Sequence, residues 1–411
     1  MQILMITPGT RGDVAPMAGL GSRLRTLGFD VAIASNAAYA PVVTSAGCEH
    51  RELPGDMSHL VSPAPPGRKE TGADLRSYMR ELGDYFELAA TGTLAAVEAG
   101  ADVVLANSVA PFAYDVAEAL GIPAIGAHLQ PTEPSGAYPP VVLGSARSLG
   151  PAGNRLLGSL IAAGKAPYDA PSARVRQVLG LPGRSRAASE RDRRKANSPV
   201  LHGISPTVFC RPADWRSGLA LTGYWWPHAE PGWQPSSQLA AFLADGPPPV
   251  FFGFGSSAAL DVDFMLDAAR SAGVRAVLQG VQGVSGSKAI SIGAVPHEWL
   301  FPQMAAVVHH AGAGTAAAGL RAGVPTVSVP IYTDQPFWAA RIASLGAGPQ
   351  PVPYRELTME RLAEAIRQAI STPDYAARAR RLSAGLATED GTAPVVAALR
   401  SATPEGTWRT S

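Results

Sequence analysis

Residues 295–337 read VPHEWLFPQMAAVVHHAGAGTAAAGLRAGVPTVSVPIYTDQPF, and this stretch decides the fold of the 411-residue chain. A short apolar run at 305–308 leads into two histidines and a glycine-rich loop. The alanine-rich segment that follows ends at a glycine and a proline, as helices commonly do. A second apolar run at 324–329 is closed by a proline, and the polar turn at 333–336 begins another helix-like segment. The pattern predicts strand, turn, helix, strand, turn and helix.

Both turns are expected at the carboxyl ends of parallel strands, where such sheets bind their ligands. Free amides at the start of a helix attract anions, so the sequence predicts a phosphate site at Gly314 and Thr315. His310 lies beside that site as a possible hydrogen-bond donor. Asp334 and Gln335 in the next turn offer a carboxylate and an amide, which are groups that pair with vicinal hydroxyls. A nucleotide sugar carries both phosphates and vicinal hydroxyls, so a phosphate site beside a hydroxyl site predicts that the chain binds such a molecule.

The same residues have structural alternatives. His310 could be a strand-end histidine with locally satisfied nitrogens, and Gly312 and Gly314 could serve only to permit a tight turn. The acidic and amide pair of the second turn could likewise cap a helix before its proline. The spacing of a histidine, two glycines and a threonine favours the phosphate interpretation. His309 should point to the opposite face of its strand and is predicted to be structural.

Two separated groups of motifs stand in one order along the chain. They are H-A-G-A-G-T at 310–315 with T-D-Q-P-F at 333–337, and T-P-G-T-R-G-D-V-A-P at 7–16. Together they resemble the family 1 glycosyltransferases of the GT-B fold, most closely the bacterial sterol and antibiotic enzymes such as those of the vancomycin pathway. The resemblance implies an α/β protein with two Rossmann-like domains facing across a cleft. It also implies a nucleotide-sugar donor, a small-molecule acceptor and no further cofactor.

The resemblance assigns the donor diphosphate a contact with Ser256, within G-F-G-S-S-A at 253–258. That segment also matches a dinucleotide-binding pattern that requires an acidic residue at the end of the next strand. The next predicted strand ends instead at Gln279, so the sequence does not favour NAD.

The donor base and ribose are expected to be held near Val295 and by His297. In plant members of the family a tryptophan stacks on the base and a glutamate binds the ribose. Here Ala294 and Ala318 stand near those positions, which leaves the nucleobase undecided. Trp299 could supply the missing ring, but its neighbours favour an apolar helix start.

Asp13 is the expected general base. Sugar transfer requires an acceptor hydroxyl to lose its proton during attack, so a fixed base must lie within hydrogen-bond reach. The preceding loop, Gly9, Thr10, Arg11 and Gly12, resembles the loop that carries an aspartate in antibiotic-pathway members, whereas other relatives carry a histidine. Asp13 could also cap the helix that follows, and the two roles are compatible. Capping is expected to lower its pKa, which weakens a base.

Composition places further bounds on function. Hydrophobic residues make up 46% and charged residues 16% of the chain, which fits a globular α/β protein. The net charge of +1 gives no reason to expect nucleic acid as a partner, and the basic run at 184–195 is predicted to be a solvated surface. Two cysteines cannot form a disulfide framework. The amino terminus lacks a basic leader, and no apolar run approaches the ~20 residues that span a bilayer. A cytoplasmic protein without stable membrane insertion is expected.

The strand and helix alternation starts at the amino terminus and starts again near residue 249, after a region rich in Pro, Gly and Trp. Loops at 54–70 and 129–155, dense in Pro and Gly, are expected to shape the acceptor site. The predicted parts are an acceptor-binding domain at 1–210, a linker region at 211–247, a nucleotide-sugar-binding domain at 248–390, and at 391–411 a helix that packs back on the first domain, with a tail.

The sequence therefore predicts an inverting, metal-independent glycosyltransferase that moves a sugar from a UDP- or dTDP-sugar to a hydroxyl of a natural product, such as an antibiotic, or of a sterol-like aglycone. The D-x-D triplet at 261–263 begins a predicted helix and is interpreted as a cap, not a metal site. One alternative is a nucleotide-sugar epimerase or hydrolase of the same fold. Another is a catalytically silent partner protein that binds sugar nucleotides.

Overall fold

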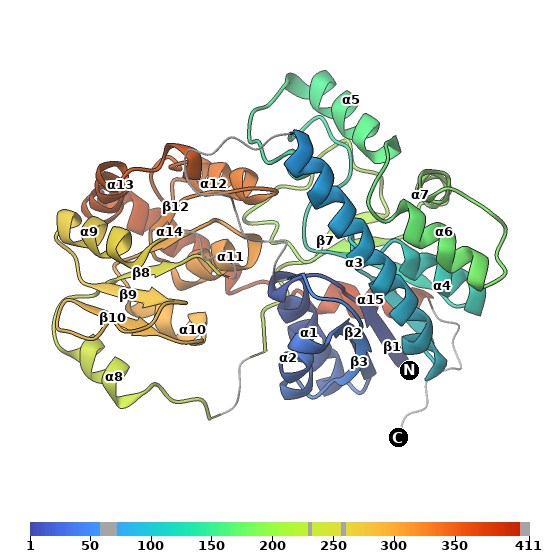
Figure 1. Ribbon diagram of the computed structural model, residues 1–411, viewed down its shortest axis with the longest axis horizontal. Coiled ribbons are helices and arrows are strands. Elements are labelled where there is room, and N and C mark those ends of the chain that lie inside the picture. The colour runs from blue at the N-terminus through green and yellow to red at the C-terminus, as the bar shows by residue number, and fades with distance from the viewer. Residues whose placement is uncertain (58–71, 229–231, 256–259, 403–411) are drawn as a thin grey trace.

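Two α/β domains, each built on one parallel sheet, lie side by side in the computed structural model (Figure 1). The structure describes residues 1–57, 72–228, 232–255 and 260–402, with only the backbone of 72–75. The first sheet has the strand order β3-β2-β1-β4-β5-β6-β7. Its strands are β1 Gln2–Ile6, β2 Asp30–Asn36, β3 Glu49–Leu53, β4 Val103–Ala106, β5 Ala124–His128, β6 Val200–His202 and β7 Leu219–Leu221.

Helices cover both faces of this sheet, which explains why its central strands are apolar without alternation. One face packs on α1, α2 and α15, and the other packs on α3, α4 and α6. The helices of this domain are α1 Arg11–Thr26, α2 Ala40–Ser45, α3 Gly72–Glu98, α4 Phe112–Leu120, α5 Gly150–Ala163, α6 Asp169–Val178 and α7 Arg186–Lys195, with 3-10 turns η1 Ala37–Tyr39 and η3 Val141–Leu143.

The second sheet has the order β10-β9-β8-β11-β12, with all pairs parallel. Its strands are β8 Val250–Gly253, β9 Ala276–Gln279, β10 Ala289–Ile292, β11 Ala306–His309 and β12 Thr326–Ser328. Its helices are α8 Ser237–Ala244, α9 Val262–Ala272, α10 His297–Leu300, α11 Ala313–Ala322, α12 Gln335–Ser344, α13 Met359–Ser371 and α14 Pro373–Leu386, with 3-10 turns η4 Phe301–Gln303 and η5 Tyr354–Glu356. In both sheets the first strand in sequence lies inside, and the order reverses beside it, as in doubly wound folds.

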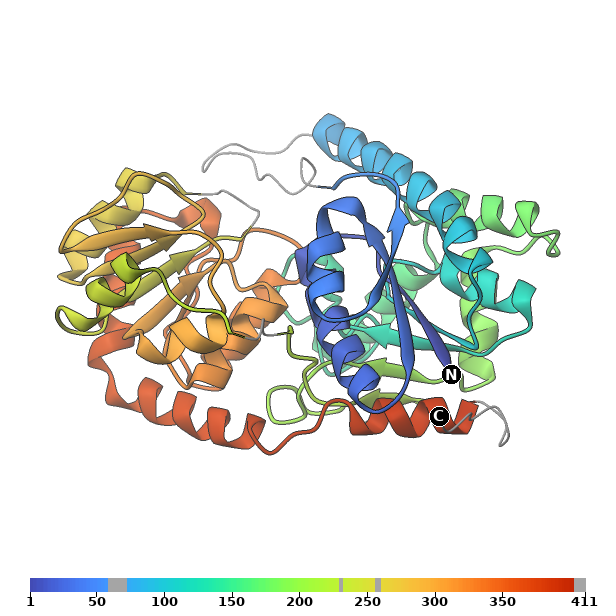
Figure 2. The ribbon, with the colours of Figure 1, turned by 90° about the horizontal axis from the view of Figure 1, so that it is seen from below.

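The carboxyl-terminal segment joins the two domains. Helix α14 packs beside α11, and the chain then crosses to the first domain, where α15 Ala393–Ala402 lies against β1 and α1 (Figure 2). Val395 and Leu399 of α15 are fully buried in that core. The indole Nε1 of Trp225 donates a hydrogen bond to the Gly391 carbonyl over 3.0 Å, which fixes the crossing.

Several sequence-based boundaries are wrong. The predicted linker at 211–247 is too wide, because β7 is the edge strand of the first sheet and α8 packs on the core of the second. The predicted loop at 129–155 contains η3 and the start of α5. Most of the loop predicted at 54–70 lies outside the described residues.

The basic run at 184–195 is also not a freely solvated surface. It forms α7, and the side chain of Arg186 is 8% exposed between Asp169 and Glu190. Ion pairing lets an arginine lie in an interior that an unpaired charge would avoid.

Replacing Leu399 with alanine should destabilise the protein by about 2–5 kcal/mol, because the site is fully buried between α15 and the first sheet. The exposed Leu156→Ala, at a position 63% exposed, is the matched control and should change the free energy of unfolding by about 0.5 kcal/mol or less. Urea denaturation measures both. Equal effects of the two substitutions would contradict the packing of α15 on this domain.

Candidate active site

The glycine-rich turn after β11 places helix amides at an open position. Ala311 adopts a φ of 62°, and Gly312 is the N-cap of α11 without a capping side chain. The amides of the first turn, at 313–315, have no partners within the helix. Gly314 is exposed, and a Cβ built there would meet nothing within 4 Å. The amides at Gly314 and Thr315, where the sequence predicts a phosphate site, are therefore open to approach by an anion.

The ring of His310 fits between two glycines. A Cβ on Gly312 would lie 2.5 Å from its Nε2, and a Cβ on Gly255 would lie 3.1 Å from its Cε1. Burial lowers the pKa of His310 to about 4, so its imidazole is neutral at pH 7 and carries one N–H. Its Nδ1 is buried without a hydrogen-bond partner in the described part of the chain. A buried polar nitrogen of this kind is expected to bond to a ligand or to water.

His309 faces the interior, as predicted. Its side chain is fully buried, and its Nδ1 accepts a hydrogen bond from the Ala311 amide over 2.9 Å. That bond holds the turn in the left-handed conformation that Ala311 adopts. Of the two neighbouring histidines, His309 thus supports the loop, and His310 lies against the N-cap of α11.

Asp334 does not use its side chain as a helix cap, although it occupies the N-cap position of α12. Its Oδ2 accepts hydrogen bonds from Trp338 Nε1 and from Gln130 Nε2, both over 3.0 Å. Its Oδ1 accepts from the Thr333 hydroxyl over 3.0 Å. Burial raises the pKa of Asp334, and these hydrogen bonds act against that rise. The carboxylate is thereby held in one orientation.

Gln335 supports the turn before it. Its Oε1 accepts hydrogen bonds from the amides of Ile331 and Tyr332 over 2.8 and 3.2 Å. Thr333 in the same turn has a φ of 52°, a conformation that a side chain other than glycine seldom adopts without support. The carbonyl of Gln335 is therefore committed to the protein, and its Nε2 is the group with donor capacity for a ligand.

Thr10, not Asp13, is the N-cap of α1, which corrects one alternative from the sequence. Thr10 and Asp13 form a capping box, in which Asp13 Oδ2 accepts from the Thr10 amide over 2.9 Å and from its hydroxyl over 3.1 Å. Burial raises the pKa of Asp13 to about 6, and the charge of Asp334 adds to the rise, against the hydrogen bonds from Thr10. The expected lowering by the cap is wrong because desolvation is the larger effect.

Side chains at the carboxyl ends of neighbouring strands hold the Asp13 loop. Gly9 has a φ of 125°, and its amide donates to the Tyr85 hydroxyl over 2.6 Å, which in turn donates to Asn36 Oδ1 over 2.6 Å. A Cβ on Gly9 would lie 2.5 Å from Asp13 Oδ2, so only glycine fits there. The Asn107 amide donates to the Thr7 hydroxyl over 3.0 Å and is one of the groups that lower the pKa of Asp13.

Sequence reasoning missed several of these supporting residues. Asn36, Asn107 and Gln130 lie at or just beyond the ends of β2, β4 and β5, so polar residues at predicted strand ends could have pointed to them. Tyr85 lies in the middle of α3 and carries no such signal. Gly12 and Arg11 are exposed in the first turn of α1, and the charge of Arg11 contributes to the lowered pKa of His297 in the other domain.

His297 lies at the start of α10 with its ring stacked on Phe301 at 4.2 Å between centroids. Its Nε2 lies 3.3 Å from Gln279 Oε1, and burial lowers its pKa to about 4. Through these contacts, His297 and Phe301 form a packed wall at the start of α10. Val295 packs at the edge of the second core, and Trp299 packs on Trp233 at 5.1 Å, in agreement with the apolar interpretation of that tryptophan.

An open hollow lies next to this wall, at the carboxyl ends of β9 and β10. It is lined by residues 280–283 and 291–293. Ser256 lies outside the described residues. Asp261 is the N-cap of α9 and accepts from the Asp263 amide over 2.8 Å, which confirms the interpretation of the D-x-D triplet as a cap.

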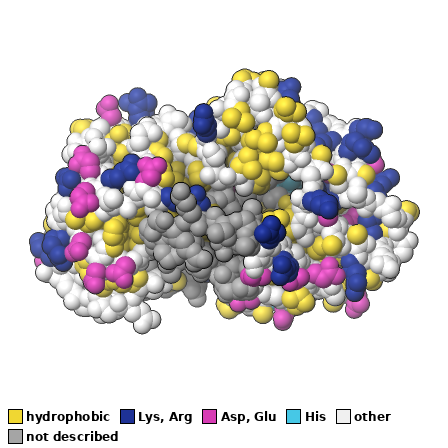
Figure 3. All heavy atoms as spheres, turned by 45° about the horizontal axis from the view of Figure 1, so that its top comes forward, with side chains coloured by type: hydrophobic (Ala, Val, Ile, Leu, Met, Phe, Trp, Pro, Cys, Tyr) yellow, Lys and Arg dark blue, Asp and Glu magenta, His cyan; other side chains and the backbone are white. Residues whose placement is uncertain are grey.

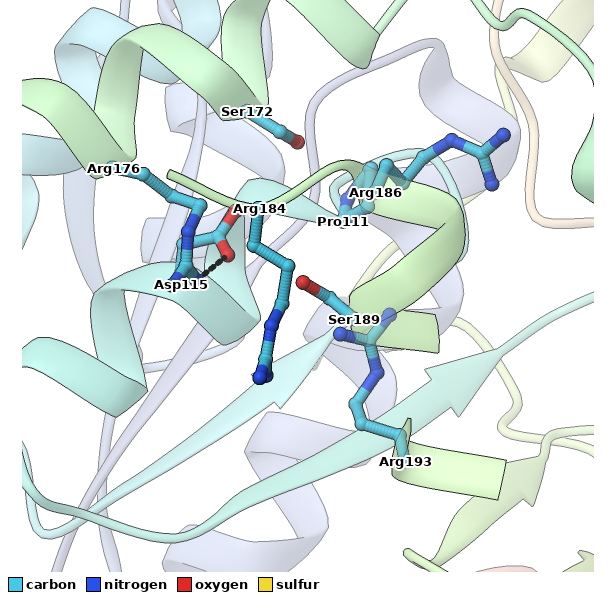
Figure 4. A pocket seen from close by; sticks show the side chains of 8 residues that line it. All are labelled: Pro111, Asp115, Ser172, Arg176, Arg184, Arg186, Ser189 and Arg193. Atoms are coloured by element: carbon cyan, nitrogen blue, oxygen red, sulfur yellow. Dashed lines mark hydrogen bonds and ion pairs between the residues drawn. The ribbon is translucent and has the colours of Figure 1, made fainter. Parts of the chain in front are cut away.

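A second hollow, far from these loops in the sequence, lies among α4, α6 and α7 (Figure 4). Arg176 pairs there with Asp115 over 2.8 Å and with Glu118 over 2.7 Å, and Arg193 stacks over Tyr114 at 4.0 Å. Arg184 and Arg186 have carboxylate partners too. The arginines and carboxylates around this hollow already neutralise one another. We therefore interpret them as a structural ion-pair network. Its lining consists of Pro111, Asp115, Ser172, Arg176, Arg184, Arg186, Ser189 and Arg193.

Within the described ranges, no group of three or more His, Cys, Asp or Glu side chains is arranged to hold a metal ion. None of the helices in the same ranges is long and apolar enough to cross a membrane.

Each half of the chain matches a known protein family. Residues 3–139 match the glycosyltransferase family 28 N-terminal domain, and residues 257–401 match the erythromycin biosynthesis protein CIII-like C-terminal domain. The chain is 35% identical over 406 residues to an O-mycaminosyltylonolide 6-deoxyallosyltransferase of Streptomyces fradiae, covering 95% of both. It is 31% identical to a sterol 3-beta-glucosyltransferase of Arabidopsis thaliana, covering 97% of this chain and 65% of that relative.

Solved structures with the same fold include the glycosyltransferase of kitacinnamycin, with a TM-score of 0.70, 20% identity, and coverage of 98% of this chain and 99% of that one. The glycosyltransferase VinC in complex with dTDP has a TM-score of 0.67 at 19% identity, with coverage of 98% and 99%. These likenesses confirm the GT-B arrangement of two Rossmann-like domains. The chain belongs to the family 1 glycosyltransferases, as the resemblance of its motifs predicts.

The raised pKa of Asp13 predicts a stability that depends on pH. The folded chain binds this proton more tightly, with a pKa of about 6, than the ordinary value of 3.8 for an unfolded chain, so stability is lost as the pH rises from 4 to 6. Asp13→Asn should therefore raise the free energy of unfolding at pH 7.5 by about 2 kcal/mol and change it little at pH 4.

Urea denaturation at the two pH values checks this expectation, with the exposed Asp30→Asn as control. A gain of equal size at both pH values would show that hydrogen bonding, not titration, is responsible.

Because Gly312 leaves room for the His310 ring, substitution of either residue should weaken nucleotide binding. Gly312→Ala should displace the His310 ring and His310→Ala should remove it, so each should weaken the binding of a nucleoside diphosphate about 10- to 100-fold, the range for a hydrogen bond to a charged group. Gly286→Ala, where a new Cβ has space, is the control. Calorimetric titration measures the three affinities. Unaltered binding by Gly312→Ala would show that the position of the His310 ring does not matter for binding the diphosphate.

Proposed function

We propose that this enzyme transfers a sugar from a nucleoside-diphosphate sugar to a hydroxyl group of a small apolar acceptor, with inversion at the anomeric carbon. One observation carries the proposal: Asp13 of the first domain, with its pKa raised to about 6, lies close enough to Asp334 of the second domain for their charges to interact. A carboxylate base from one domain and a sugar-binding carboxylate from the other are the two groups that such a transfer brings together.

The second domain binds the donor. The free amides at Gly314 and Thr315, together with the N–H of the neutral His310, face a diphosphate and stabilise its charge as it leaves. Asp334 and the Nε2 of Gln335 then bond to hydroxyls of the sugar. The family resemblance of the sequence assigns Ser256 a further contact with the diphosphate. Backbone near Val295 and the wall at His297 border the base, beside the hollow at the ends of β9 and β10. The base is uracil or thymine, and VinC was solved with dTDP.

Asp13 of the first domain takes the proton of the acceptor hydroxyl as the hydroxyl oxygen bonds to the anomeric carbon and the bond to the diphosphate breaks. A pKa of about 6 leaves Asp13 ionised at pH 7 while making it a stronger base than an ordinary aspartate. Direct attack from the side opposite the leaving group inverts the anomeric centre. No covalent sugar intermediate is required.

Helix amides, rather than a divalent ion, are expected to carry the leaving-group charge. The D-x-D triplet supports this view because Asp261 is engaged in capping α9. The nucleotide sugar is thus the one co-substrate the reaction needs, and no further cofactor takes part.

The acceptor is expected to be a natural product, such as an antibiotic, or a sterol-like aglycone. The segment between β5 and α5 exposes Val142, Leu143 and Leu149 at 55, 51 and 55%, and hydrophobic side chains gather over α5 (Figure 3). This surface suits an apolar polycycle or macrocycle. Relatives named for tylonolide and sterol acceptors point the same way.

Asp13→Ala should lower kcat about 100- to 10,000-fold, the usual loss for a general base, with little change in the donor KM. In the wild type, kcat/KM should fall below pH 6 as Asp13 is protonated. The measurement is release of nucleoside diphosphate over a panel of donors and polycyclic, macrolide and glycopeptide acceptors, with NMR assignment of the product anomer.

Equal turnover by wild type and Asp13→Ala would remove Asp13 as the base. Release of diphosphate at the same rate without any acceptor would indicate a nucleotide-sugar hydrolase. A retained anomeric configuration would rule out direct inversion.

A further inference from the structure

The side-chain amide of Gln130 reaches from the first domain to the carboxylate of Asp334 in the second. Gln130 is the second residue beyond β5, and its Nε2 donates to Asp334 Oδ2 over 3.0 Å. The other two side chains that donate to this carboxylate, Thr333 and Trp338, belong to the same domain as Asp334. In the described ranges, Gln130 is therefore the side chain through which the first domain holds the sugar-binding group.

The three hydrogen bonds set the orientation of the carboxylate. Among these side chains, Trp338 and Gln130 both donate to Oδ2, whereas the Thr333 hydroxyl donates to Oδ1. A carboxylate offers about four acceptor positions, so Oδ1 retains capacity for a sugar hydroxyl. Removing the Gln130 amide would leave Oδ2 with one donor and allow the carboxylate to rotate about its bond.

The same amide favours the charged form of Asp334. Asp334 is buried, with 8% of the residue exposed, and burial raises its pKa. The charge of Asp334 in turn raises the pKa of Asp13 in the first domain. The hydrogen bond from Gln130 lowers the pKa of Asp334, in the direction that keeps it an acceptor for hydroxyls.

A second contact joins the same two segments. A Cβ built on Gly144 would lie 3.4 Å from the Thr333 amide, so the chain after η3 lies against the turn that precedes α12. Gln130 and Gly144 both belong to the segment between β5 and α5, which is the segment proposed above to border the acceptor. The acceptor side of the enzyme thus contacts the donor-sugar turn at two points.

We propose that Gln130 is a positioning residue, which orients Asp334 for the donor sugar only when the two domains are together and so couples the acceptor-bordering segment to donor recognition. This inference rests on the proposed function, because it requires that Asp334 bind a sugar hydroxyl. It predicts an effect on the sugar part of the donor and none on the nucleotide part.

The test compares Gln130→Ala with wild type and with Gln177→Ala, an exposed glutamine on α6. Gln130→Ala should lower kcat/KM for the nucleotide sugar about tenfold or more, the usual loss for a hydrogen bond to a charged group. Its affinity for the nucleoside diphosphate without sugar should equal that of wild type. The ratio of transfer to donor hydrolysis should fall, since the domain contact that limits water is weakened. Gln177→Ala should match wild type in all three.

The pH dependence of Gln130→Glu distinguishes positioning of Asp334 from a purely structural role, which would not alter that dependence. A glutamate there would face Asp334 directly, so one of the two carboxyls must be protonated for them to share a hydrogen bond. Activity should be low at pH 8 and should recover partly as the pH falls towards 6, whereas Gln130→Ala should show no such recovery. Thermal unfolding of each variant shows whether the fold is intact.

Donor kcat/KM unchanged in Gln130→Ala, with transfer by wild type intact, would overturn this inference and leave the proposed function standing. An equal loss of affinity for the sugar-free diphosphate would also overturn it. A wild type that binds nucleotide sugars but transfers none would overturn the proposed function and this inference together.

Discussion

Desolvation of two carboxyl groups is the constraint on which the rest of the site depends. Asp13 and Asp334 come from different domains and are close enough for their charges to interact, and burial raises the pKa of each. Two like charges with little water around them are stable only if hydrogen-bond donors are fixed around them. The capping box at Thr10, the Trp338 indole and the Gln130 amide supply those donors.

Close packing also explains the glycines and strained turns nearby. Gly9 leaves room for the Asp13 carboxylate, and Gly312 leaves room for the His310 ring. Ala311 and Thr333 adopt positive φ, and each turn is held by a neighbouring side chain, His309 for one and Gln335 for the other. Strain of this kind persists where surrounding groups determine the conformation. The backbone conformation of the two turns is therefore fixed by contacts within the protein.

The arginine network between α4, α6 and α7 shows the opposite balance. It gathers more charged side chains than the candidate active site, yet each of its carboxylates pairs with an arginine. The site at the domain interface instead combines a neutral histidine, an elevated carboxyl pKa and open helix amides. A region that can bind a charged substrate is thus distinguished by polar groups left without partners in the protein and by shifted pKa values, not by the number of its charges.

The sequence by itself determined the class of fold, the strands such as 103–106 and 276–279, and the turns that carry Asp13, His310 and Asp334, because these depend on local apolar patterns and on glycine and proline spacing. Only the tertiary structure decided the width of the linker, the pairing of the α7 arginines, the rise in the pKa of Asp13 and the contact between Gln130 and Asp334. Residues 130 and 334 are far apart in the chain, and desolvation depends on what packs around a group. Local sequence specifies neither the contact between Gln130 and Asp334 nor the burial of Asp13, so both depend on how the whole chain folds.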